Sequence, residues 1–403
     1  MTDLPRRDLF DLPEGVIYLD GNSLGPLPKV AKARVAEAVT EHWGKELIRG
    51  WNSAGWIDLP ARIGDRIAPL IGAEKGAVMA CDSTSVNLFK VLSAALSLSD
   101  RRVVLSDMGN FPTDLYVAQS LLGAMRSPED LKIVAPDAVG DAIDETVAVV
   151  MLTQVDYRTG RLHDMAAITA TAHAAGALVI WDLAHSAGAL PVDLQGCRAD
   201  FAVGCGYKYL NGGPGAPAFL YVRPDHADRI APALGGWMGH AAPFAFDLDY
   251  HPAQGVERMR VGTPPILSMV ALDAALDLWA EVDIGAVRAR SIALADLFIA
   301  EVEANCAGFG LSLATPRQGA MRGSQVSFHL PDTDGKDRGY AAMQALIAED
   351  VIGDFRAPDL LRFGFAPLYN TEEEVREAAQ RLSAILKERR WDQPEFLTRS
   401  KVT

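Results

Sequence analysis

The chain has 403 residues and a formal net charge of −14, because 52 Asp and Glu outnumber 38 Lys and Arg. Hydrophobic residues are 49% and charged residues 22% of the sequence, which excludes a mostly disordered chain and leaves ample apolar surface for a large core. The acidic balance argues against nonspecific nucleic-acid binding and against docking on anionic membranes.

Residues 1–30 are rich in Gly and Pro and contain one short strand signal at 16–19, and residues 29–48 are typical of an amphipathic helix. From about residue 60 to 275, strand and helix signals alternate. The predicted strands are 77–80, 102–106, 131–134, 147–152, 177–181, 200–203 and 218–222, and the predicted helices are 85–98, 113–122 and 166–175. Short apolar strands between helices indicate a mainly parallel sheet that is buried on both faces, which is an α/β architecture.

The pattern changes after about residue 280. A long helix is predicted at 282–304, strands at 325–330 and 361–365, and a helix at 371–390 with Thr371 as its N-cap. We therefore expect a smaller α+β C-terminal domain. The predicted organisation is an N-terminal segment packing with the small domain, a large domain and the small domain, with the bounds 1–50, 51–280 and 281–403.

Cysteine usage and the N-terminus favour a cytoplasmic protein. The chain has four cysteines and no CxxC pair, so we expect a reducing compartment and no disulfide framework. Residues 1–10 carry charges and lack the apolar core of a signal peptide, and the densest apolar run, 147–152, is too short to span a bilayer. No metal-ligand spacing is present, so no metal is expected. The cysteines are interpreted as core residues, and His163, His173 and His226 as surface or loop residues.

A lysine in a glycine-rich loop is the first candidate for chemistry. Lys208 follows a strand signal within the run GYKYLNGGPG at 206–215. Taken alone, such a lysine is most often a solvated surface residue. At the end of a buried strand and flanked by aromatic residues, however, it suits a Schiff base, because desolvation lowers the pKa of the amine and keeps it nucleophilic.

An aspartate ends an earlier apolar strand. Asp182 lies 26 residues before Lys208, which is about one strand–crossover–strand unit. Ligands bind at the carboxyl ends of strands in open α/β sheets. Asp182 is either a helix-capping or turn aspartate or the partner of a pyridinium nitrogen, whose protonated form makes the ring an electron sink.

Two helix starts complete the pattern. The run 82–85, Asp-Ser-Thr-Ser, stands directly before a helix, where free N–H groups either are capped by a hydroxyl or bind an anion such as phosphate. At 110–114, Phe111 either stacks on a flat ring or merely precedes a helix that starts with Pro112. Together with Lys208 and Asp182, these are the parts of a pyridoxal 5′-phosphate (PLP) site, and their chain order resembles fold type I of the PLP-dependent enzymes, the aspartate-aminotransferase-like superfamily.

Several strings resemble the kynureninase family, and they appear in that family's order over about residues 15–390. They are DGNSLG at 20–25, FPTD at 111–114, DLAH at 182–185, YKYLN at 207–211, GGW at 235–237, PPIL at 264–267 and RFGFAPLYN at 362–370. No departure occurs at a motif position. The resemblance implies a PLP-dependent hydrolase that cleaves the Cβ–Cγ bond of L-kynurenine to anthranilate and L-alanine in tryptophan catabolism.

The resemblance also implies a role for individual residues. Lys208 carries the cofactor, Asp182 faces its ring nitrogen, and Tyr207 reaches the phosphate and is a candidate proton donor. The other cofactor contacts implied are Thr84, Ser85, Phe111, Asp114, Thr153 and His185, with Trp237 and Thr263 supplied by the neighbouring chain of a homodimer. Arg362 matches the arginine that binds the substrate carboxylate, and Ser23 lies near the substrate.

Substrate choice is a finer hypothesis. Trp51, with Gly262 and Thr263, resembles the bacterial type of pocket, which favours kynurenine over 3-hydroxykynurenine. Trp51 is otherwise a core tryptophan. The pocket of the animal type has a histidine and a serine–asparagine pair at these places.

Two other functions remain as alternatives. A cysteine desulfurase or selenocysteine lyase needs a histidine directly before the lysine, where this chain has Tyr207, and a mobile catalytic cysteine, for which Cys306 at a helix end is a poor candidate. A PLP-binding regulator without turnover needs an N-terminal DNA-binding module and a basic surface. About 50 residues precede the core of the fold, and the chain is acidic.

Overall fold

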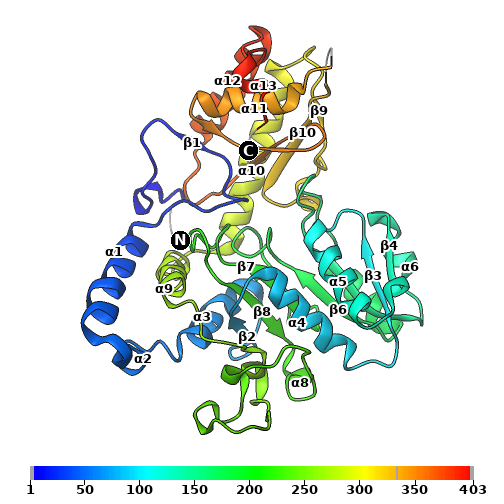
Figure 1. Cartoon of the computed structure of the whole chain (residues 1–403). Coiled ribbons are helices and arrows are strands. Elements are labelled where there is room, and N and C mark those ends of the chain that lie inside the picture. The colour runs from blue at the N-terminus through cyan, green and yellow to red at the C-terminus, as the bar shows by residue number, and fades with distance from the viewer. Residues whose placement is uncertain (1–3, 333–334, 400–403) are drawn as a thin grey trace. The chain divides into compact units, whose positions relative to one another are not determined.

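The computed structural model describes residues 4–332 and 335–399, which form two compact units (Figure 1). The small unit contains the described residues up to Lys29, the segment Val155–Leu162 and the chain from Leu278 onward. The large unit contains Val30–Gln154 and His163–Asp277. Compared with the predicted ranges 1–50, 51–280 and 281–403, residues 30–50 group with the large unit and 155–162 with the small one.

A seven-stranded sheet forms the centre of the large unit, with the order β2-β8-β7-β6-β5-β3-β4. Its strands are β2 (Val78–Ala80), β3 (Val103–Asp107), β4 (Leu131–Val134), β5 (Val147–Thr153), β6 (Leu178–Asp182), β7 (Phe201–Cys205) and β8 (Ala218–Val222). Strand β8 runs antiparallel to both of its neighbours, β2 and β7, and the other pairs of neighbouring strands in this sheet are parallel. Strands β5, β7 and β8 are buried along their whole length, as expected for apolar strands between two layers of helices.

The large unit also contains helices, several of which pack against the sheet. They are α1 (Lys29–Glu37), α2 (Gly50–Ser53), α3 (Leu59–Ile67), α4 (Thr84–Leu96), α5 (Pro112–Ala124), α6 (Val139–Ala142), α7 (Met165–Ala174), α8 (Pro224–Ala227) and α9 (Ile266–Ala275). A wider helical turn at Ala38–Glu46 continues α1, so the predicted helix 29–48 is present in an irregular form. Helices α3 and α9 were not predicted.

The small unit combines helices with an antiparallel sheet of order β12-β13-β10-β9 and a parallel pair β1-β11. Its elements are β1 (Ile17–Tyr18), α10 (Ile284–Asn305), β9 (Ser312–Leu313), β10 (Gln325–His329), α11 (Arg338–Ala348), β11 (Val351–Ile352), β12 (Asp354–Arg356), β13 (Leu360–Gly364), α12 (Glu372–Lys387) and α13 (Pro394–Leu397). Phe298 lies at the centre of its core and contacts Phe328, Phe363 and Phe365. Thr371 caps α12 in a capping box with Glu374, as predicted.

The expectation of a surface or loop position is wrong for His226, which lies in α8, whereas His163 lies in a loop as expected but not at the surface. His163 and His226 are buried, and each contacts a buried aspartate, Asp107 and Asp200 respectively. His173 is partly buried and also binds Asp200. Histidines at the ends of elements look exposed in a sequence because their carboxylate partners come from distant strands.

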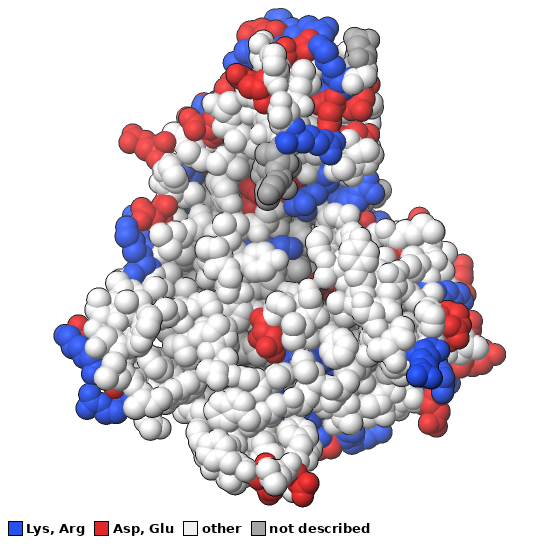
Figure 2. Space-filling view, in the orientation of Figure 1, with Lys and Arg blue, Asp and Glu red and all other residues white. Residues whose placement is uncertain are grey.

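Acidic and basic side chains are interspersed on the face shown in Figure 2. The loop of the large unit at about 235–250, at the bottom of Figure 1, carries five exposed apolar or aromatic side chains, and the surface over it is mostly uncharged in Figure 2. They are Trp237, Phe244, Phe246, Leu248 and Tyr250. Within the described ranges, no helix is long and apolar enough to cross a membrane.

Candidate active site

Three neighbouring strands of the large unit end at one edge of the sheet, and each brings a candidate residue there. Thr153 ends β5 and lies opposite Asp182, which ends β6. Asp182 in turn lies opposite Val203 of β7, and Lys208 follows shortly after β7 ends. Because these strands are parallel, the sequence order of strand ends becomes a spatial cluster at the carboxyl edge of the sheet.

Lys208 is partly buried and lies close to two rings. Its Nζ is 3.0 Å from His185 Nε2 and 5.9 Å from the centre of the Tyr207 ring. His185 is buried, three residues after Asp182. Burial raises the pKa of the Tyr207 hydroxyl above its usual range, so this phenol keeps its proton.

Asp182 and Asp114 form a buried carboxyl pair. Burial raises the pKa of Asp182, while nearby Lys208 and the Ala184 N–H, 2.6 Å from Oδ1, oppose that rise. For Asp114, burial and the neighbouring Asp182 raise the pKa well above its usual range, so Asp114 holds the proton and donates to Asp182. Asp114 Oδ2 is buried and has no hydrogen-bond partner among the described residues. The pair can therefore accept a further cationic or N–H donor.

Asn110 joins two of the predicted residues. This buried side chain accepts hydrogen bonds from the Thr153 hydroxyl and from Phe111 N at 2.8 Å. Its Nδ2 donates to Ser106 Oγ and to the Met151 carbonyl. Asn110 thus fixes the start of α5, where the Phe111 ring is 40% exposed and able to lie over a flat ligand.

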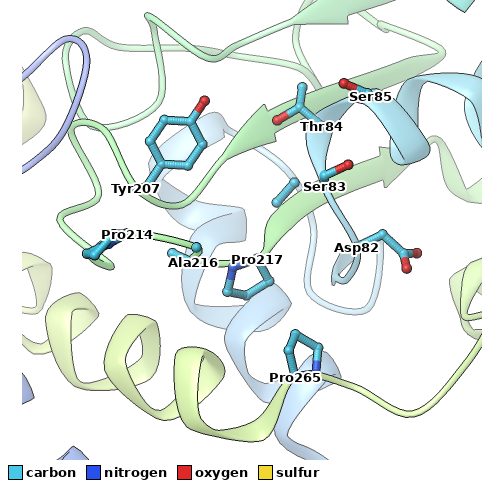
Figure 3. A pocket seen from close by; sticks show the side chains of 11 residues that line it. Asp82, Ser83, Thr84, Ser85, Tyr207, Pro214, Ala216, Pro217 and Pro265 are labelled. Carbon is cyan, nitrogen blue, oxygen red and sulfur yellow. The ribbon is translucent and has the colours of Figure 1, made fainter. Parts of the chain in front are cut away.

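The N-terminus of α4 opens into a cavity of about 520 Å³. Ser83 is the N-cap and accepts from Val86 N, and Thr84 and Ser85 are the first helical residues. The hydroxyl groups of Thr84 and Tyr207 face the same space (Figure 3). Free N–H groups, hydroxyls and the helix dipole make this cavity suitable for a phosphate group. Among its other lining residues are Asp82, Pro214, Gly215 and Pro265.

The remaining candidates on the large unit lie on short or irregular segments. Trp51 is half-buried in α2 and packs edge-on against Trp56, with ring centres 6.0 Å apart. Trp237 is 40% exposed and packs edge-on against Phe244. Gly262 and Thr263 are exposed. These residues are available to a ligand or a second chain.

Arg362 and Ser23 come together in the small unit. Arg362 is 1% exposed and lies on β13, and its Nη2 donates to Ser23 Oγ at 3.0 Å. Arg362 Nε and Nη2 also face the two oxygens of Asp354 on β12, and Nη1 donates to the Tyr157 carbonyl. This arrangement holds the guanidinium plane in one orientation.

Sequence reasoning missed three polar residues of these clusters. Asn110 stood inside a recognised string without a role. Asp354 and Arg356 lie on a strand of three residues, which is too short to show a pattern, and the only signal was their position shortly before Arg362. Groups of three or more metal-ligating side chains are absent from the part of the chain that the structure describes.

The fold is that of solved PLP-dependent enzymes. A cysteine desulfurase of Escherichia coli superposes with a TM-score of 0.78 at 20% identity, covering 95% of this chain and 97% of that one. A cysteine desulfurase of Thermococcus onnurineus gives 0.79 at 20% identity over 96% and 99% of the two chains. At this identity the likeness shows the fold alone. The chain therefore has fold type I, the fold of these enzymes, as predicted.

Sequence identity to curated kynureninases is far higher than to these desulfurase structures. A kynureninase of Pseudomonas fluorescens is 51% identical over 405 residues, covering 99% of this chain and 96% of that protein. A kynureninase of Burkholderia pseudomallei has the same identity and coverage. The family model of the kynureninase C-terminal domain matches residues 287–382. The chain belongs to the kynureninase family, and the resemblance drawn from its motifs is confirmed.

Proposed function

We infer that the chain is a PLP-dependent hydrolase that cleaves the Cβ–Cγ bond of L-kynurenine to give anthranilate and L-alanine. The observation that carries this function is identity of 51% to kynureninases along almost the whole chain. The cluster of Lys208, Asp182 and the start of α4 at one edge of the sheet supports it. Tryptophan catabolism is the corresponding pathway.

The residues of the large unit fit PLP. The α4 N-terminus with Thr84 and Ser85 suits the phosphate, and the buried Asp182–Asp114 pair suits a pyridinium N–H. Lys208 is suited to form the Schiff base with the aldehyde, and Phe111 is suited to stack on the face of the ring. When bound, PLP supplies the electron sink that stabilises a carbanion next to the amino group of the substrate.

The protein's own groups then have separate tasks. Lys208 Nζ takes the proton from the substrate Cα, and His185 beside it restricts where the amine can lie. Tyr207 keeps its proton because of burial and is our candidate for returning protons during cleavage. Thr153, held by Asn110, would contact bound PLP from the end of β5.

On the small unit, Arg362 binds the α-carboxylate of the substrate, and Ser23 lies beside it. A guanidinium suits a carboxylate, and that of Arg362 has a fixed orientation because its Nε and Nη2 already bind Asp354. Asp354 neutralises part of the charge and orients the fork. This role fits a substrate that is an amino acid.

We propose a homodimer in the cytoplasm. The exposed loop with Trp237, Phe244, Phe246 and Leu248 carries more apolar surface than single scattered residues do, which favours burial against a second copy. Trp237 and Thr263 would then contact the phosphate of the neighbouring chain. All four cysteines are free, which suits a reducing compartment.

The alternative activities lose support. Cys306 is buried, and burial raises the pKa of its thiol to about 11, whereas a desulfurase needs an exposed, reactive thiolate. Identity to desulfurases is 20%, against 51% to kynureninases.

The test is a turnover assay with purified, PLP-loaded protein. L-kynurenine should give fluorescent anthranilate, and Lys208→Ala should abolish product. With 3-hydroxykynurenine we expect slower turnover. If neither compound reacts while Lys208 still carries PLP, the substrate assignment is wrong and the cofactor assignment stands.

A further inference from the structure

Lys90 is a buried charge that the proposed reaction leaves unexplained. It lies in the second turn of α4, and its side chain is 0% exposed. Its Nζ donates to Asp82 Oδ2 at 2.6 Å, to the Met259 carbonyl at 2.7 Å and to Cys81 Sγ at 3.3 Å. An ammonium removed from water is costly unless it is paired and hydrogen-bonded, and all three of its donors are occupied here.

The first partner of Lys90 belongs to the loop that lines the cavity. Asp82 directly precedes Ser83, the N-cap of α4, and has a φ of +48°, which few residues other than glycine adopt. A second bond, from Asn87 Nδ2 to the Cys81 carbonyl at 2.7 Å, also runs from α4 back to this loop. The helix therefore holds its own N-terminal loop in a strained conformation through Lys90 and Asn87.

The negative charge of Asp82 lies close to the proposed phosphate site, and Lys90 neutralises it. Its carboxylate belongs to a residue that lines the cavity beside Thr84 and Ser85. In Figure 3 it points away from Tyr207. A phosphate at the helix N-terminus would still lie near this negative charge, and like charges repel over several ångströms in a partly buried site. Lys90 pairs with Asp82 and neutralises its charge, so a phosphate bound there would meet less repulsion.

The third partner links a second segment. Met259 is buried and ends the short helical turn Gly255–Met259, shortly before Gly262 and Thr263. Thr263 is the residue proposed to reach the phosphate of the neighbouring chain. The Lys90 ammonium thus binds both the loop before α4, which lines the proposed phosphate site, and the segment before Thr263, which is proposed to contact the second chain.

We propose that Lys90 is a positioning residue for the PLP phosphate, which acts by holding and neutralising Asp82 and by fixing Met259. The inference rests on the proposed PLP site. It assigns no contact between Lys90 and the cofactor. Its effect must therefore depend on Asp82 and on the phosphate, whereas a merely structural role would depend on neither.

The experiment titrates the full-length apo-chain with PLP and, separately, with pyridoxal, which lacks the phosphate. The visible absorbance of the lysine–aldehyde adduct reports binding. Lys90→Met should weaken PLP binding by about tenfold or more and change pyridoxal binding less than about twofold, because only the phosphate meets the unneutralised Asp82. Adding Asp82→Asn to Lys90→Met should restore most of the PLP affinity. Lys75→Met, which breaks the exposed Lys75–Asp65 pair, is the matched control and should leave both affinities unchanged.

Equal losses for PLP and pyridoxal in Lys90→Met, or no loss for either, would overturn the inference. If Lys90→Met does not fold, PLP binding by the single variant Asp82→Asn tests the inference instead. Asn tolerates positive φ, so the loop is kept, and PLP must bind at least as tightly as in the unmodified chain. Weaker PLP binding there overturns the inference. If the unmodified chain binds PLP and pyridoxal equally well, the phosphate site itself is wrong, and the inference fails with it.

Discussion

Arg362 and Asp354 face each other across neighbouring strands of the small unit, with Arg362 Nε 2.7 Å from Asp354 Oδ1 and Nη2 at Oδ2. Both side chains are almost completely buried. Arg362 lowers the pKa of Asp354 against the effect of burial, so the carboxylate stays ionised. Arg356 binds the same carboxylate at 2.7 Å. One aspartate thus orients two arginines, of which Arg362 is our candidate for binding the substrate carboxylate.

Asp354→Asn should therefore impair substrate binding more than chemistry. Without the second charged oxygen, the Arg362 fork loses its fixed orientation, and we expect kcat/KM for kynurenine to fall roughly tenfold to a hundredfold, mainly through KM. Steady-state kinetics check this. Asp359→Asn, which affects the partly exposed His329–Asp359 pair of the same unit, is the control. A fall in kcat at constant KM would contradict the positioning role.

Asp20 gives the small unit a pH dependence near neutrality. Burial first, and then the nearby Asp354, raise its pKa from 3.8 to about 7, although Arg362, Ser23 and Arg356 oppose the rise. The native state then holds a proton that the unfolded chain releases above about pH 4. The stability that Asp20 contributes is thus complete below about pH 4 and is lost as the pH rises through about 7.

Thermal unfolding at pH 5 to 8, compared between the unmodified chain and Asp20→Asn, tests this expectation. The Tm of the unmodified chain should fall relative to that of the variant as the pH increases. Tyr18, which also faces Asp20, titrates above this range because burial raises its pKa. A constant difference in Tm between the two proteins would show that Asp20 does not titrate there.

The sequence was most informative where a residue follows an apolar strand. Asp182 and Lys208 were predicted because strand ends meet at one edge of a parallel sheet, and this rule needs no knowledge of side-chain partners. Lys90 and Asp354 could not be predicted in the same way. Their roles depend on partners such as Met259 and Arg362, which tertiary packing supplies and periodicity does not encode. Helix α9 was missed because it is apolar on most faces, so no amphipathic pattern marks it.

Asn110→Ala should weaken the cofactor site. The change removes the side-chain oxygen that accepts hydrogen bonds from the Thr153 hydroxyl, which is buried, and from Phe111 N, which is partly buried. We expect a loss of about 2 kcal/mol in stability and a roughly tenfold lower kcat/KM. Chemical unfolding and kinetics measure the two effects. Asn305→Ala, at an exposed helix end, is the control. Normal kinetics in Asn110→Ala would exclude a role in positioning Phe111 and Thr153.

Asp200 is expected to matter for stability but not for chemistry. It precedes β7, at the edge of the sheet opposite to Lys208, and binds His173, His226 and Arg223. Burial opposes these bonds, but together they lower its pKa to about 2. Its contribution is present above about pH 4 and is lost as the pH falls through about 2. Asp200→Asn should cost about 3 kcal/mol at neutral pH with kcat retained. Asp225→Asn, at the exposed partner of Arg223, is the control, and an equal loss in both variants would contradict the expectation.

Trp51 offers a test of substrate choice. Its ring, held edge-on by Trp56, presents an apolar face and little capacity to bind a ring hydroxyl. Trp51→His introduces a polar donor or acceptor, as in the animal type of pocket. The ratio of kcat/KM for 3-hydroxykynurenine over kynurenine should therefore rise by roughly tenfold. Trp43→His, at an exposed tryptophan of the same unit, controls for a general effect of the exchange. If the ratio is unchanged in Trp51→His, discrimination lies elsewhere, with Gly262 and Thr263 the next positions to exchange.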